Sequence, residues 1–230
     1  MIENVTVLIP AYQPDGQLTA LVGRLREAFA HVVLVDDGST EGRAVFDAVR
    51  AQVDAVLVHP ANRGKGAALR TGLAWIRDHQ PDAAGVVTAD ADGQHRVADI
   101  VRVATALADQ SDGLVLGVRH FGRHVPFRSR FGNHWTTLFF WLFTGLWIRD
   151  TQTGLRGIPR ALFDRLLALR GDRYEYEMRM LVDARRHAQK PLQLPIETVY
   201  IDGNRSSHFN PLRDTLLTQG ALLSARFGRS

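Results

Sequence analysis

The chain has 230 residues, of which 45% are hydrophobic and 23% charged, values ordinary for one large globular domain or a core with a small appendage. A formal net charge of +4 permits contact with nucleotides, phosphates or acidic lipids, but it is too small to indicate a nucleic-acid-binding protein. The absence of cysteine excludes a disulfide framework and thiolate chemistry.

The first segment of the chain predicts a strand, a helix and a second strand. Residues 5–9 are apolar or β-branched, and Pro10 is expected to end that strand. Apolar residues then follow helical spacing over residues 18–29, and residues 31–35 form a second strand before Asp37. A carboxylate at this point is placed to accept hydrogen bonds from the ribose or base of a nucleotide. A helix N-cap is the alternative role for Asp37.

Glycine and lysine follow the third predicted strand, at residues 55–58. Two glycines flank Lys65 at the start of a helix predicted over residues 67–77. Backbone N–H groups, the positive end of a helix dipole and a cation together favour phosphate. The spacing is not that of a Walker A loop.

Two carboxylates, Asp90 and Asp92, follow the fourth predicted strand, at residues 85–89. Ligands of open parallel α/β sheets bind at this edge, beyond the carboxyl ends of the strands. Carboxylates two residues apart repel each other unless a cation lies beside them, and hard oxygen ligands favour Mg²⁺ or Mn²⁺ shared with substrate phosphates. The pattern predicts a metal–diphosphate site, with a solvated turn as the alternative. A helix near residues 100–107 and a strand at 114–118 follow.

Four loops in this order resemble those of family 2 glycosyltransferases with the GT-A fold; they are residues 10–12, 36–39, 62–66 and 90–95. Two later segments, residues 150–156 and 204–209, are similar to motifs of the dolichyl- or polyprenyl-phosphate sugar synthase branch. The resemblance implies an α/β protein with a Rossmann-like, mixed but mostly parallel sheet flanked by helices. It also implies a single GT-A domain over residues 1–230, with a nucleotide-sugar-binding half (1–118) and an acceptor half (119–230).

The implied activity is that of an inverting glycosyltransferase. It would move a sugar from a GDP- or UDP-sugar to an acceptor, for which polyprenyl phosphate is the first choice. A hydroxyl acceptor on a glycan, a lipid or a small molecule is the alternative. A sugar nucleotidyltransferase is less favoured, because residues 10–12 stand where that class has a glycine-rich loop.

The resemblance also assigns roles residue by residue. Donor binding falls to Pro10, Ala11, Tyr12, Asp37, Lys65, Asp90 and Ala91. The ligands of Mg²⁺ or Mn²⁺ would be Asp90, Asp92 and Gln94. The acceptor phosphate would meet Arg119, Arg130 and Arg205, whereas Asp150 would be the base if the acceptor were a hydroxyl.

Side chains near these motifs receive structural interpretations. His95 is expected to have a structural or substrate-contact role rather than to bind the metal. The carboxylates of Glu175 and Glu177 are expected on a solvated helix face, or in a salt bridge to Arg179 or Arg173.

An aromatic run at residues 134–148 holds three of the four tryptophans. About fifteen residues are too few to span a bilayer, which takes roughly 20. The run predicts an interfacial helix in the membrane surface, with a buried or dimer-packing helix as the alternative. A late strand at 195–201 is expected at a sheet edge because it contains a proline. No signal peptide is predicted, so a cytoplasmic location is expected, with peripheral contact at the inner membrane face.

Overall fold

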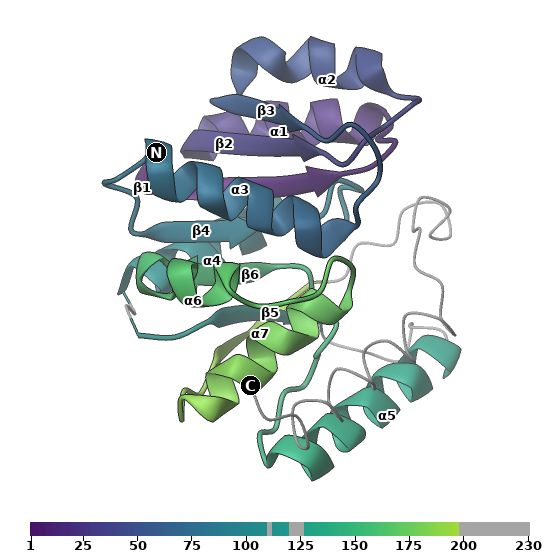
Figure 1. Cartoon of the computed structure of the whole chain (residues 1–230), viewed down its shortest axis with the longest axis vertical. Helices are drawn as coiled ribbons and strands as arrows, with labels where there is room; N and C mark the ends of the chain where they lie inside the picture. The colour runs from purple at the N-terminus through teal and green to yellow at the C-terminus, as the bar shows by residue number, and fades with distance from the viewer. Residues whose placement is uncertain (110–111, 120–126, 198–230) are drawn as a thin grey trace.

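A computed structural model describes residues 1–109, 112–119 and 127–197; for residues 127–135 it describes the backbone alone. The strands are β1 (Ile2–Ala11), β2 (Phe29–Asp36), β3 (Ala55–Val58), β4 (Gly85–Thr88), β5 (Val115–Arg119), β6 (Arg156–Pro159) and β7 (Leu192–Ile196). The helices are α1 (Gly16–Ala28), α2 (Arg43–Val49), α3 (Lys65–His79), α4 (Val97–Asp109), α5 (Phe127–Thr144), α6 (Phe163–Leu167) and α7 (Glu175–Arg186). These elements are labelled in Figure 1.

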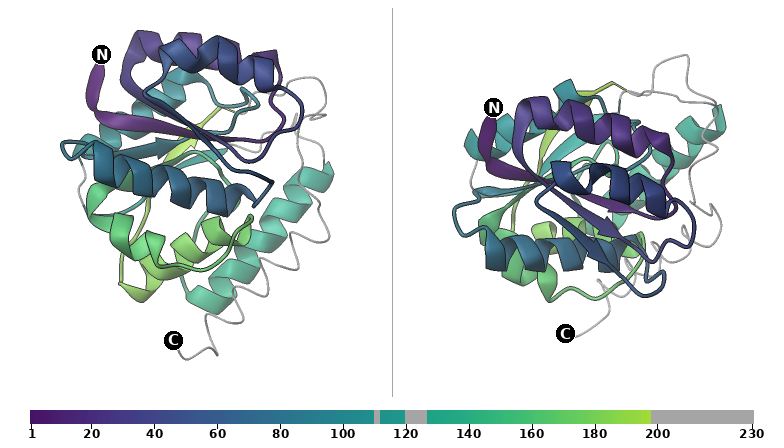
Figure 2. Two further views of the ribbon diagram at one scale, coloured as in Figure 1. Left: turned by 45° about the horizontal axis from the view of Figure 1, so that its top comes forward. Right: turned by 90° about the horizontal axis from the view of Figure 1, so that it is seen from above.

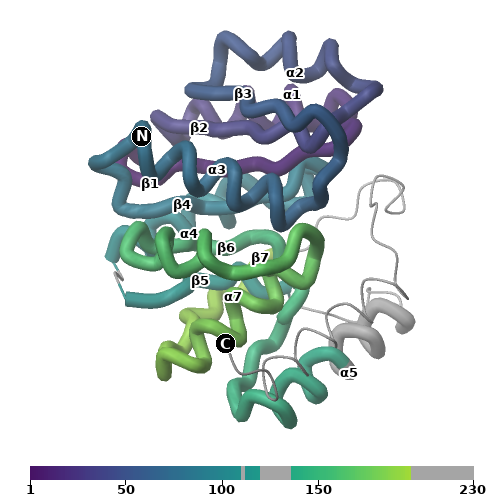
Figure 3. The backbone as a smooth tube through the Cα atoms, viewed as in Figure 1, coloured from purple at the N-terminus to yellow at the C-terminus, as the bar shows by residue number. Residues whose placement is uncertain are grey.

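The strands form one seven-stranded sheet in the order β3-β2-β1-β4-β6-β5-β7. The four strands from β3 to β4 run parallel, β6 is antiparallel to both of its neighbours, and β7 is parallel to β5. The predicted mixed, mostly parallel α/β sheet is therefore confirmed, and Figure 3 shows its path as a tube. β7 lies at the sheet edge, as its proline predicts, although the strand begins three residues before the predicted range 195–201.

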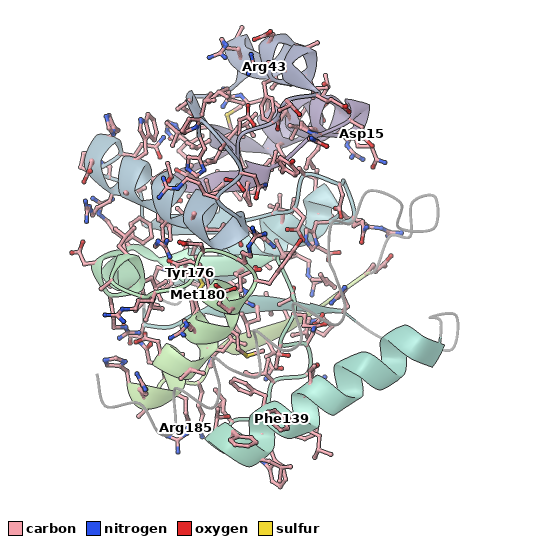
Figure 4. All side chains as sticks on the ribbon, turned by 45° about the vertical axis from the view of Figure 1, so that its right-hand side comes forward. Asp15, Arg43, Phe139, Tyr176, Met180 and Arg185 are labelled. Atoms are coloured by element: carbon pink, nitrogen blue, oxygen red, sulfur yellow. The ribbon has the colours of Figure 1, made fainter. Side chains whose placement is uncertain are left out.

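Helices cover both faces of this sheet, because its strands are apolar on both sides. One core includes side chains from α3, α6 and α7, among them Tyr176 and Met180, which Figure 4 labels. The other core includes side chains from α1, α2 and α4. Figure 2 shows the sheet between these two layers of helices. α1 starts where Asp15 accepts a hydrogen bond from the backbone N–H of Gln17, an ordinary N-cap.

The predicted end of the first strand is wrong. Pro10 does not end β1, which continues to Ala11. Beyond Leu8, β1 pairs with β2 alone, so Pro10 lies where one side of the strand has no partner, and a sheet tolerates proline there.

The helix predicted at 134–148 is α5, which begins at residue 127 and ends at Thr144, so both predicted bounds are wrong. Gly145 follows with φ +68° and donates its N–H to the carbonyl of Trp141, so Trp147 lies beyond the helix. Arg185, at the end of α7, donates to the carbonyl of Thr144 and ties the ends of the two helices together (Figure 4). No helix in the described part of the chain is long and apolar enough to cross a membrane.

Candidate functional site

A cavity of about 610 Å³ lies at the carboxyl ends of β1, β2 and β4. All the residues that the sequence assigns to donor and metal binding line it, together with the first acceptor arginine. They are Pro10, Ala11, Tyr12, Asp37, Lys65, Asp90, Ala91, Asp92, Gln94 and Arg119. Residues from the second half of the chain, among them Thr151, Gln152, Arg173 and Glu177, also line it. The fold thus brings loops from both halves of the chain to one cavity.

Of the three remaining predicted residues, the structure describes the side chain of Asp150 alone. Asp150 is fully buried behind the cavity wall. Arg130 belongs to α5, where the structure describes only the backbone. Arg205 lies outside the described residues.

Asp90 is the centre of a cluster of charged side chains at the cavity. Its Oδ1 lies 2.7 Å from Lys65 Nζ, and its Oδ2 lies 3.2 Å from Nε2 of His95. Burial opposes ionisation of Asp90, but the neighbouring Lys65 and His95 outweigh it and hold the pKa of this carboxyl well below its ordinary value. His95 therefore contacts a proposed metal ligand, and its expected role, structural or in substrate contact, stays a prediction. Gly154 makes room for the carboxylate, since a Cβ there would lie 2.3 Å from Asp90 Oδ2.

Glu177 is a member of this cluster that sequence reasoning missed. The expectation of a solvated or Arg173- or Arg179-paired carboxylate is wrong, because Glu177 is only 5% exposed. Its Oε2 lies 3.2 Å from Lys65 Nζ, and its Oε1 lies 3.7 Å from Nε of the buried Arg156. Burial alone would lower the pKa of Lys65, yet Asp90 and Glu177 raise it above its ordinary value.

Asp92 lies beside this cluster and accepts a hydrogen bond from the backbone N–H of Gln94 at 3.1 Å. Burial, and next the charge of Asp90, raise its pKa above the ordinary value. Such a pair of oxygen donors suits a divalent cation, which would relieve the repulsion. The described residues contain no group of three or more His, Cys, Asp or Glu side chains that could hold a metal. Substrate phosphates and water would have to complete the shell, as is usual for Mg²⁺.

Asp37 fastens the loop that carries Lys65. Its Oδ1 accepts from the backbone N–H of Arg63 at 2.9 Å and lies 2.7 Å from Nδ1 of the buried His59. Its Oδ2 accepts from the backbone N–H of Gly64 at 2.7 Å. The helix N-cap alternative for Asp37 is wrong, because α2 begins after Gly42 without a side-chain cap.

The glycines beside Lys65 have a packing role. A Cβ on Gly64, whose φ is +100°, would lie 2.4 Å from the carbonyl oxygen of Asp172, and one on Gly66 would lie 2.6 Å from Tyr176 Cβ. The backbone N–H of Ala67 donates to that same Asp172 oxygen at 3.0 Å. The glycines therefore let the start of α3 approach the segment before α7.

The loop that follows Arg149 is anchored by two arginines. Arg119 forms a bidentate ion pair with Asp150, with Nε 2.6 Å from Oδ2 and Nη2 3.1 Å from Oδ1. Arg156, almost fully buried, donates to the carbonyl oxygens of Thr153, Glu177 and Thr151 at 2.9, 2.6 and 3.2 Å. The loop thus holds Thr151 against the cavity.

Sequence comparison identifies relatives of this chain. The UDP-N-acetylglucosamine–dolichyl-phosphate N-acetylglucosaminyltransferase of Methanococcus voltae is 27% identical, over 86% of this chain and 86% of its own length. The polyprenol monophosphomannose synthase of Mycolicibacterium smegmatis is 28% identical, over 71% of this chain and 64% of its own.

The fold is also that of a solved enzyme. Glucosyl-3-phosphoglycerate synthase from Mycobacterium tuberculosis, crystallised with Mn²⁺, UDP and phosphoglyceric acid, superposes with a TM-score of 0.71, covering 99% of this chain and 79% of its own at 17% identity. At this identity the likeness establishes the GT-A fold and nothing more. The sequence model described as "Glycosyl transferase family 2" matches residues 6–167, more than half of the chain. The chain therefore belongs to glycosyl transferase family 2.

Proposed function

We propose that this glycosyltransferase moves a sugar from a uridine diphosphate sugar to a polyprenyl or dolichyl phosphate, with Mg²⁺ or Mn²⁺ as cofactor. The carrying observation is that one cavity holds the carboxylate pair, Lys65 and Asp37 on the donor side and Arg119 on the other. Bound there, the cation would neutralise charge on the leaving diphosphate, and Asp90, Asp92 and Gln94 would hold it. Inversion at the anomeric carbon is the outcome that the family resemblance implies.

The hydrogen bonds that Asp37 already accepts favour uracil over guanine as the base of the donor nucleotide. A carboxylate offers about four acceptor positions, and Asp37 already receives the N–H groups of Arg63, Gly64 and His59. One further donor can be accepted. Uracil presents a single imide N–H, whereas guanine presents an N–H and an adjacent amino group that favour a carboxylate with two open positions. The Methanococcus voltae relative is named for a UDP-sugar as well.

A phosphate acceptor is supported by the position of Asp150. A phosphate monoester, with a second pKa of about 6, already carries an anionic oxygen and needs no general base. Asp150, the residue proposed as base for a hydroxyl acceptor, is fully buried and has both carboxylate oxygens occupied by Arg119. The names of two relatives contain dolichyl phosphate or polyprenol.

The acceptor phosphate would meet Arg119, with Arg130 and Arg205 as further proposed contacts. Arg173 is an additional candidate, because it lines the same cavity. Guanidinium groups offer planar pairs of donors suited to phosphate oxygens. Because the chain belongs to glycosyl transferase family 2, we no longer propose a sugar nucleotidyltransferase. Transfer to a hydroxyl acceptor stays the second candidate.

A peripheral membrane contact is proposed at the end of α5. Trp141, Leu142 and Trp147 are 43%, 59% and 48% exposed, and the two indole rings pack edge to face. Exposed tryptophans beside an aliphatic side chain are typical of surfaces that enter the lipid headgroup region. A second copy of the chain is the alternative partner for this surface.

The activity is tested by incubating the protein with UDP- and GDP-sugars and Mn²⁺, with and without polyprenyl phosphate. We expect release of UDP, and formation of a glycosylated lipid phosphate detected by mass spectrometry, only when all three components are present. Release of GDP would contradict the donor assignment. Transfer to a hydroxyl compound without consumption of lipid phosphate would contradict the acceptor assignment.

A further inference from the structure

Lys65 is shared between two carboxylates from different parts of the chain, the partly exposed Asp90 and the buried Glu177. Its Nζ lies 2.7 Å from Oδ1 of Asp90, which follows β4, and 3.2 Å from Oε2 of Glu177 on α7. The start of α3 is fixed in place, because Asp172 accepts from the N–H of Ala67. The ammonium therefore contacts both carboxylates at once. A small shift of the flexible Lys65 side chain would bring the ammonium closer to one carboxylate and farther from the other.

Among the described residues, Lys65 has the cationic nitrogen closest to the Glu177 carboxylate. Arg156 lies 3.7 Å away, and its guanidinium donates instead to the carbonyl oxygens of Thr151, Thr153 and Glu177. Among the residues that the structure describes, no donor forms a hydrogen bond with Glu177 Oε1. A buried carboxylate with an unpaired oxygen costs folding free energy, so packing alone does not account for it.

Asp90 would have two cationic partners once a divalent cation binds. The proposed function, on which this inference rests, requires Asp90 to bind a divalent cation. That cation and the ammonium of Lys65 would repel each other if Asp90 were the only partner of both. We propose that Glu177 is a positioning residue that takes the ammonium of Lys65 when Asp90 binds the cation. Lys65 then stays at the cavity beside the donor diphosphate without competing for Asp90.

A double-mutant cycle with Mn²⁺ alone as the probe tests this inference. Mn²⁺ affinity is measured by electron paramagnetic resonance for the wild type, Glu177→Gln, Lys65→Met and the double variant. We expect Glu177→Gln to weaken Mn²⁺ binding by about tenfold or more when Lys65 is present. In the Lys65→Met background, the loss of affinity caused by the same substitution should be smaller by a factor of about five or more. Equal losses in both backgrounds would mean that Glu177 acts only through its long-range charge, and would overturn the proposal.

A matched control separates this effect from a loss of folding. Asp183 is also a buried carboxylate on α7, paired with Arg165 at 2.6 Å and absent from the cavity lining. Asp183→Asn should lower the melting temperature while Mn²⁺ affinity stays within about twofold of wild type. If Glu177→Gln does not fold, Glu177→Asp, which keeps the charge but withdraws it from Lys65, takes its place in the cycle.

The cycle also separates this inference from the proposed reaction. A wild-type protein that binds Mn²⁺ but does not glycosylate a lipid phosphate would contradict the acceptor assignment, while the cycle would still decide the role of Glu177. A wild-type protein that binds no Mn²⁺ would overturn both the metal site and this inference.

Discussion

Arg119 and Asp150 form a bidentate ion pair in which the carboxylate is fully buried and the guanidinium reaches the cavity. The backbone N–H of Gln152 also donates to Asp150 Oδ1. With its oxygens used in this way, Asp150 is suited to hold Arg119 in one orientation. It is poorly suited to accept a proton from a substrate, which would have to reach a buried atom.

Replacement of these two residues should therefore give different kinetics. Asp150→Asn keeps the shape and one acceptor, so we expect kcat to fall by about tenfold while turnover stays measurable. Arg119→Ala should raise the KM of the lipid phosphate strongly and leave UDP affinity unchanged. Steady-state kinetics together with calorimetry of UDP binding would measure both. An inactive Asp150→Asn that still folds and binds the donor would favour a hydroxyl acceptor.

Asp92→Asn should abolish most of the metal-dependent donor affinity. The substitution keeps the shape of the side chain but removes the charge, so binding of UDP with Mn²⁺ should weaken by more than tenfold, about 2 kcal/mol or more. Calorimetry with and without Mn²⁺ is the measurement. Asp82→Asn, which changes an exposed carboxylate before β4, is the control and should bind as wild type does. Unchanged affinity in Asp92→Asn would remove this carboxylate from the site.

The same substitution should stabilise the protein when no metal is present. Burial and the charge of Asp90 raise the pKa of Asp92, so its native form binds a proton more readily than its unfolded form. Stability is therefore lost as pH rises from the ordinary pKa of aspartate through the raised one. At pH 7 with a chelator, Asp92→Asn should melt at a higher temperature than wild type. Below the ordinary pKa the difference should vanish, and an equal difference at both pH values would contradict this explanation.

The residues that the sequence assigns to donor binding share one cavity because they lie at the carboxyl end of a strand or in the loop that follows it. Asp37, Lys65 and Asp90 follow β2, β3 and β4, and parallel strands bring their carboxyl ends to one edge. Glu177 carries no such signal. Its burial depends on Lys65 and Arg156, which are distant in the sequence, and an isolated carboxylate on a helix reads as solvated.

The sequence pattern does not predict β6, for a related reason. Its four residues, 156–159, include an arginine, a glycine and a proline, which do not form an apolar strand pattern. Arg156 is buried because backbone carbonyls satisfy its guanidinium. Gly157 admits the side chains of Val103 and Val115, which would lie 3.2 and 3.1 Å from a Cβ there. These tertiary contacts override the local propensity.

Arg156 should be among the most sensitive positions for stability. Arg156→Met would leave three buried carbonyl oxygens without their donor and would remove a cation from beside the Glu177 carboxylate, so we expect the free energy of unfolding to fall by about 3 kcal/mol or more. Arg156→Lys should recover only part of this, because an ammonium cannot reproduce the planar donor geometry. Urea unfolding followed by tryptophan fluorescence measures both.

Arg160 is the matched control for this prediction. It also donates to two backbone carbonyls, those of Gln80 and Arg77, but it is half-buried, and water can replace it. Arg160→Met should cost about 1 kcal/mol. Equal losses at the two positions would show that burial of the Arg156 guanidinium adds nothing to the stability of the loop.

The exposed aromatic surface at the end of α5 leads to a prediction about membranes. Trp141, Leu142 and Trp147 point toward solvent, whereas the neighbouring Phe140 is fully buried in the core shared with α3, α6 and α7. The pair Trp141→Ser and Leu142→Ser should release the protein from anionic liposomes in a flotation assay without lowering its melting temperature. Phe140→Ala should do the reverse, lowering the melting temperature as core truncation does while flotation persists. If the serine variant instead stays bound and changes its sedimentation from dimer to monomer, this surface packs against a second copy of the chain, and a lipid acceptor would have to reach the cavity without this contact.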